Sequence, residues 1–114
     1  MAITQDLTLT QGTDARFKIN IKDETGAAKD ISGKSFVAGA KKSYSDSTTI
    51  SFTTVVLDAA AGQIRISLDN DQTAGLDSSI RYVYDVFMYD AGNTNVTEVV
   101  SGKIFVEPSV SRVG

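Results

Sequence analysis

Cysteine is absent from this 114-residue chain, which excludes a disulfide framework, a thiolate metal site and a thiol nucleophile. Histidine is absent as well, so the chain lacks the commonest general base, the commonest metal ligand and any serine–histidine arrangement. No apolar run approaches the roughly 20 residues that span a membrane. We therefore expect no enzyme activity, no metal or other cofactor, no small-molecule substrate and no membrane partner.

The charge balance is mildly acidic. Eleven lysines and arginines stand against 14 aspartates and glutamates, for a formal net charge of −3 at pH 7. A surface of this sign does not favour a nucleic-acid partner. The first residues carry neither a basic start nor an apolar stretch, so we expect no signal peptide and synthesis in the cytoplasm. The length fits a single domain over residues 1–114.

Apolar and polar residues alternate along much of the sequence, and this period of two predicts β-strands. The clearest case is the segment 15–21, where every odd position is apolar, as in a strand with one buried face. Residues 50–56 and 64–68 alternate in the same way. A short connection that ends at Gly62 joins them, which predicts a hairpin.

Three further segments carry signals of a particular structure. Residues 80–89 are apolar on both faces, so we expect a central strand that is covered on both sides. The last run, from Val96 to Val106, is interrupted at Gly102, which we interpret as a bulge. An Asp or Asn cap before Gln-Thr-Ala-Gly predicts one helical turn near 71–76.

These elements amount to about seven strands and one short helical turn. No connection is long enough for a crossover helix, so parallel βαβ units are excluded. The pattern favours an all-β fold, namely an antiparallel immunoglobulin-like β-sandwich, with a small barrel as the alternative. Two polar ends, Met1 to Asp6 and Ser109 to Gly114, are predicted to be arms that contact neighbouring proteins.

Two acidic stretches are candidates for metal binding or acid–base catalysis. Asp69, Asn70 and Asp71 group oxygen ligands, but their offsets do not match a calcium loop, and helix capping is the favoured interpretation. Asp85 lies inside the apolar segment. It is either an acid–base residue or, as we favour, a carboxylate that pairs with an arginine or with loop amides. The arginines considered for this pairing are Arg16, Arg65 and Arg81.

The tyrosines allow two interpretations. Exposed rings at Tyr82 and Tyr84, or at Tyr44 and Tyr89, would suit a sugar-binding platform. The favoured interpretation is that the rings pack in the protein interior while each hydroxyl makes a hydrogen bond, and Tyr82 or Tyr84 could then serve as a tyrosine corner. The single basic pair, Lys41 and Lys42, is too small for a phosphate-binding patch and is expected at a solvated strand end.

Turn glycines, alternating strands and a Tyr-Asp pair also recur in a fixed order. They occupy Leu7–Gly12, Lys22–Gly26, Ile31–Phe36, Asp58–Ile64, Thr73–Leu76, Arg81–Val86, Asp90–Gly92, Ser101–Val106 and Glu107–Arg112. This series resembles the immunoglobulin-like domain at the N-terminus of baseplate and tail-fibre adaptor proteins of tailed bacteriophages. The resemblance covers nearly the whole chain and implies no catalytic or ligand-binding residue.

The resemblance, together with the missing catalytic chemistry, predicts a non-catalytic structural component of a phage particle. Its expected location is the virion, as a tail, baseplate or neck accessory protein. Its expected partners are other phage structural proteins and copies of itself. A capsid decoration protein is the first alternative, and a carbohydrate-binding β-sandwich module is the second.

Overall fold

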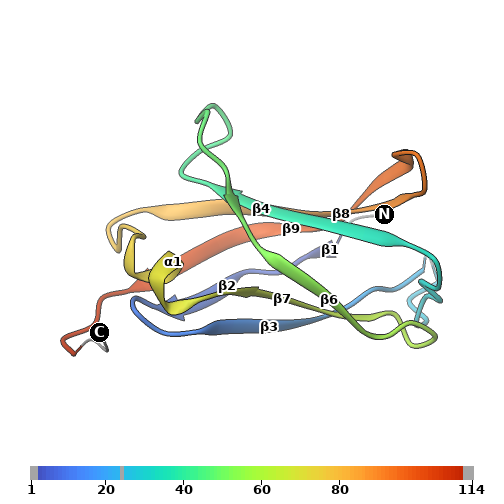
Figure 1. Ribbon diagram of the computed structural model, residues 1–114, viewed down its shortest axis with the longest axis horizontal. Coiled ribbons are helices and arrows are strands. Elements are labelled where there is room, and N and C mark those ends of the chain that lie inside the picture. Colours follow the sequence, from blue (N-terminus) through green and yellow to red (C-terminus); the bar gives the residue numbers. More distant parts are fainter. Residues whose placement is uncertain (1–2, 24, 112–114) are drawn as a thin grey trace.

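The alternating segments of the sequence form the strands of two packed sheets. A computed structural model describes residues 3–23 and 25–111, and within them the chain is mostly β and folds as a β-sandwich-like arrangement (Figure 1). The elements are β1 (Ile3–Thr4), β2 (Leu7–Thr10), β3 (Ala15–Asn20), β4 (Ser35–Lys41), β5 (Ile50–Ser51), β6 (Thr53–Asp58), β7 (Gln63–Leu68), α1 (Asn70–Ala74), β8 (Arg81–Asp90) and β9 (Thr94–Glu107).

The larger sheet has the strand order β1-β9-β8-β4-β5, and β2 follows β1 along the same edge of β9. The smaller sheet has the order β3-β7-β6. Most neighbours are antiparallel, but β1 and β2 run parallel to β9. The expectation of a purely antiparallel sandwich is therefore wrong at this edge. The parallel pairing needs no crossover helix, because six other strands separate β2 from β9 along the chain and return it to this side.

The core lies between the two sheets and follows the predicted alternation. Ala15 and Ile19 of β3 are buried, and so are Ile64, Ile66 and Leu68 of β7. The larger sheet contributes Leu7, Leu9, Ala38, Ala40, Tyr82, Tyr84, Val86, Met88, Val100, Ile104 and Val106. Since one face of each of these strands supplies the buried side chains, burial fixes the register of these strands.

The predicted hairpin of residues 50–56 and 64–68 is confirmed in its second half, where β6 pairs antiparallel with β7. The first half differs, because residues 50 and 51 form β5 and pair with β4 of the larger sheet. The chain changes sheets at Phe52, whose backbone N–H donates to the carbonyl oxygen of Ala38 at 3.0 Å. The Phe52 ring is buried and packs at a tilt on Tyr84, with 6.3 Å between the ring centroids.

The predicted helical turn is confirmed as α1, with Asp69 as its N-cap. The Asp69 carboxylate accepts from the Gln72 backbone N–H at 2.8 Å, and the Gln72 side chain accepts from the Asp69 N–H at 3.0 Å. This reciprocal pair is a capping box. The helix is held against the turn after β2, because the Thr73 hydroxyl donates to the Thr13 carbonyl oxygen at 2.7 Å.

Gly102 is not a bulge, contrary to the sequence prediction. It pairs regularly with Tyr84, and the register shifts of the β8–β9 ladder lie nearer the hairpin turn, after Val86 and after Met88. Glycine is required at position 102 because a Cβ atom there would collide with the backbone carbonyl of Gln5. The chain steps from β1 to β2 at this point, so its backbone passes directly over Gly102.

Two hydrogen bonds hold this step in place. The Tyr84 hydroxyl donates to the Gln5 carbonyl oxygen, and the Lys103 backbone N–H donates to the Asp6 carboxylate at 3.0 Å. Residues 3–6 are thus bound to the sheet and are not the free arm that we expected. Met1 and Ala2 lie outside the described residues. At the other end, Ser109 to Ser111 follow β9 without joining a strand, and residues 112–114 lie outside the description.

Replacing Gly102 by alanine is expected to lower the free energy of unfolding by about 1–3 kcal/mol, since the new methyl group must displace backbone. Urea denaturation at pH 7 measures this change. Gly75 supplies the matched control, because its backbone is right-handed helical and the nearest atom to an added Cβ is 3.6 Å away. We expect Gly75→Ala to be neutral or to stabilise slightly. Equal losses for both variants would contradict the close-approach explanation.

Tyr84→Phe should cost about 1 kcal/mol near neutral pH, because it removes the hydrogen bond to Gln5. Burial raises the pKa of Tyr84 to about 12, from an ordinary value of 10. The folded state therefore keeps the neutral phenol, and stability that is present below pH 10 is lost as the pH rises from 10 to 12. The difference in unfolding free energy between wild type and Tyr84→Phe should narrow over this interval. A constant difference in denaturation curves from pH 8 to 12 would contradict this assignment.

Candidate interaction surface

The outward side of the larger sheet carries an apolar strip that we call the outer face. On β8, alternate residues from Tyr82 to Met88 point into the core, so the residues between them point outward. The outer face comprises Val37 of β4, Val83, Phe87 and Tyr89 of β8, and Phe105 of β9. Val37 is 52% exposed, and the other four side chains are partly buried against one another and their neighbours.

The outward side of the smaller sheet is different in composition. On β3 and β7 these residues are polar, namely Arg16, Lys18, Asn20, Gln63, Arg65 and Ser67, whereas the edge strand β6 exposes Val55, Val56 and Leu57. This is the ordinary arrangement of a sheet that has one side in water. The two outward sides of the same sandwich thus differ, because the larger sheet carries its apolar strip, with three aromatic residues, across β4, β8 and β9, whereas the smaller sheet exposes aliphatic residues on one edge strand.

The prediction that residues 80–89 are covered on both sides is wrong for the outer face. Within the described part of the chain, no sheet or helix packs over that side of β8. Two projections rise on this side instead, the loop of residues 42–49 beyond β4 and the turn between β8 and β9 (Figure 1). The strand β8 is therefore apolar on both faces, but the described residues cover only one of them.

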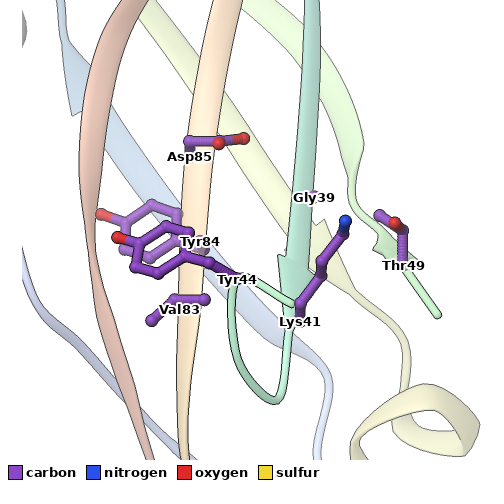
Figure 2. A pocket seen from close by; sticks show the side chains of 7 residues that line it. All are labelled: Gly39, Lys41, Tyr44, Thr49, Val83, Tyr84 and Asp85. Carbon is purple, nitrogen blue, oxygen red and sulfur yellow. The ribbon is translucent and has the colours of Figure 1, made fainter. Parts of the chain in front are cut away.

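A pocket of about 120 Å³ opens on the outer face between β4, β8 and the 42–49 loop. Figure 2 shows the Asp85 side chain extending from β8 toward β4, where Gly39 and Lys41 lie. The lining residues are Gly39, Lys41, Tyr44, Thr49, Val83, Tyr84 and Asp85. Gly39, which pairs with Asp85 across the ladder, has no side chain, and a Cβ atom there would lie only 2.8 Å from Cγ2 of Thr49.

The Asp85 side chain makes no hydrogen bond or ion pair with the described residues. Burial raises the pKa of its carboxyl group, and the nearby charge of Lys41 opposes that rise. The expected partners are elsewhere: Arg16 and Arg65 lie on the smaller sheet, and the guanidinium of Arg81 lies 5.2 Å from the centroid of the Phe105 ring. The prediction of an arginine or loop-amide partner is therefore wrong, and Asp85 is a half-buried carboxylate without a partner among those residues.

The tyrosines divide between the core and the outward side. Tyr82 and Tyr84 are buried, at 1% and 2% exposure, so these two rings cannot form an exposed platform. The Tyr82 hydroxyl accepts a hydrogen bond from the Asp77 backbone N–H at 2.8 Å, five residues upstream, which confirms packing with a bonded tip. Tyr89 belongs to the outer face, and Tyr44 is 77% exposed on the 42–49 loop.

The remaining candidate residues have structural positions. Lys41 is the last residue of β4, as the strand-end interpretation predicts, and Lys42 follows it. Asp69 is used in capping, and no group of three or more acidic residues in the described ranges could hold a metal ion. The single helix found there, α1, has five residues and is too short to cross a membrane.

No protein family and no curated protein matches this sequence at a significant level.

Asp85→Asn should stabilise the folded chain at pH 7, because the amide removes the cost of a charged group in a half-buried site. The pKa of Asp85 is raised in the folded state, so the wild-type chain recovers this cost as the pH falls and the carboxyl group protonates. The advantage of the variant in urea denaturation should therefore disappear toward pH 3.

Glu98→Gln is the control, since Glu98 is an exposed carboxylate on the same side of the sheet. Its unfolding free energy should stay within about 0.5 kcal/mol of the wild type at both pH values. A destabilised Asp85→Asn variant at pH 7 would show that the carboxylate has a favourable partner in solution.

Proposed function

We propose that the sandwich is of the immunoglobulin-like type. The order β9-β8-β4-β5 facing β3-β7-β6 supports this, since it corresponds to the strand order of a variable-type immunoglobulin sandwich. The hydroxyl of Tyr82, which is bonded to backbone five residues upstream and lies at the start of β8, resembles a tyrosine corner. Sandwiches of this type serve many functions, so the fold alone assigns none.

We infer that the protein is a non-catalytic structural component of a tailed-phage particle, a tail, baseplate or neck accessory protein that works through protein–protein assembly. The observation that carries this inference is the outer face, an apolar strip on a sheet that nothing in the described chain covers. Apolar patches of this kind on soluble domains are typical of interaction sites. The resemblance of the turn and strand series to phage adaptor domains supplies the proposed context, with the virion as the location.

A capsid decoration protein would also bind through an apolar surface. The number of copies per particle distinguishes this alternative from a tail, baseplate or neck protein. Quantitative mass spectrometry of purified particles, measured against the major capsid protein, gives that number. Tens of copies or fewer per particle support a tail, neck or baseplate position, and hundreds support decoration. Complete absence from the particles overturns the virion proposal.

Val37→Asp is expected to reduce incorporation of the chain into particles by at least about tenfold, because it places an unpaired charge within the proposed docking surface. Particles assembled with the variant as the only source of the chain are purified and quantified by mass spectrometry. Val37 is already half exposed in the free chain, so the substitution should leave the fold intact.

Val55→Asp is the matched control, since Val55 is 39% exposed and also lies in a strand, but on β6 of the smaller sheet, where it pairs with Arg65. It should be incorporated normally. Normal incorporation of Val37→Asp would remove the outer face from the proposal, and equal loss of both variants would point to a different surface.

A further inference from the structure

The charges of the outer face are sorted along its strands. The ladder places side chains in four rows across β4, β8 and β9, namely Val37–Phe87–Glu98, Gly39–Asp85–Ser101, Lys41–Val83–Lys103 and Arg81–Phe105. The first two rows hold only carboxylates as charged groups, and the last two hold only cations. Within the described chain, the one ion pair is between Lys34 and Asp90, so none of these five charged groups is neutralised by a salt bridge.

Such a face is complementary to itself. A two-fold axis that crosses the strands between the Asp85 row and the Val83 row reverses the order of rows in the opposing copy. Each Asp85 then faces the Lys41 and Lys103 row of the other copy. Since this axis keeps each strand opposite its own copy, Glu98 of β9 faces Phe105 with Arg81 beside it, and Phe87 of β8 faces Arg81. A two-fold interface requires this kind of self-matching surface.

We propose that the outer face pairs with the outer face of a second copy of this chain, about this two-fold axis. The proposal rests on the proposed use of the outer face for docking and names its occupant. A partner with one dominant charge sign would repel half of the rows, whereas a second copy satisfies both halves. The second copy also places lysine side chains opposite the unpartnered Asp85 carboxylate, and it covers the apolar outward side of β8.

The area of the outer face sets the expected affinity of the self-pairing. Four rows across three strands cover roughly 400 Å² on each copy, or about 800 Å² in total. This is the size of a weak, transient contact, so we expect a dissociation constant of about 100 μM or weaker. The pairing would then be populated at high local concentration, as in an assembling particle.

Sedimentation equilibrium of the wild-type chain from about 1 μM to about 1 mM tests the proposal. We expect a reversible monomer–dimer equilibrium that stops at the dimer, because a two-fold interface is closed. Val37→Asp should weaken dimerisation at least about tenfold, while Val55→Asp, on the smaller sheet, should leave it unchanged. Circular dichroism establishes that each variant is folded.

A charge exchange tests the axis itself. Asp85→Lys alone and the double variant Lys41→Asp with Lys103→Asp should each be monomeric, because each opposes like charges. An equimolar mixture of the two should dimerise as strongly as the wild type, because every contact regains opposite charges. Failure of the mixture to recover dimerisation, when both variants are folded, would overturn this arrangement.

The outcomes also separate this inference from the proposed function. A wild-type chain that stays monomeric to about 1 mM, but loses incorporation on Val37→Asp, docks another virion protein through the outer face, and the self-pairing is wrong. A wild-type dimer that is absent from purified particles keeps the self-pairing and overturns the virion role. Equal weakening by Val37→Asp and Val55→Asp would show that the loss is not specific to the outer face and would reject the proposed face.

Discussion

The structure depends on the packing of β8, the strand that is apolar on both faces. Its inward side chains, from Tyr82 to Met88, fill the middle of the core between the two sheets. Two of them also fix segments that are distant in space. Tyr82 binds the backbone after α1, and Tyr84 binds the backbone between β1 and β2. Buried tyrosines are suited to this, because the ring is packed while the hydroxyl reaches a backbone group that would otherwise be unsatisfied.

The same strand explains how the N-terminal edge is built. Tyr84 pairs with Gly102, and the missing side chain at Gly102 lets the Gln5 carbonyl come close enough to accept from the Tyr84 hydroxyl. β1 and β2 can then run parallel to β9 on either side of this step. The parallel edge is therefore a consequence of one glycine and one tyrosine, which lie next to each other only when β8 and β9 are paired.

The asymmetry between the two sheets is what gives the molecule a candidate function. In the smaller sheet β3 and β7 turn polar side chains outward and the edge strand β6 exposes aliphatic ones, whereas the larger sheet turns outward an apolar strip with aromatic residues and sorted charges around it. Burial of Val83, Asp85 and Phe87 is incomplete in the free chain. This surface is the basis of the proposal that the chain associates with other proteins, and the row pattern is the reason for proposing a second copy as the first of them.

Local patterns in the sequence were sufficient for the strands themselves. Alternation predicted β3 and the β6–β7 hairpin, and the Asp69 cap predicted α1, because burial of one strand face and capping of one helix are decided by residues close in sequence. Tertiary structure decided the rest. The division of residues 50–58 between two sheets, the purpose of Gly102 and the lack of a partner for Asp85 each depend on strands far apart along the chain. The apolar pattern of residues 80–89 predicted two covers for β8, but only the fold shows that this chain's described residues supply one of them, since a sequence pattern records how apolar a face is and not which molecule covers it.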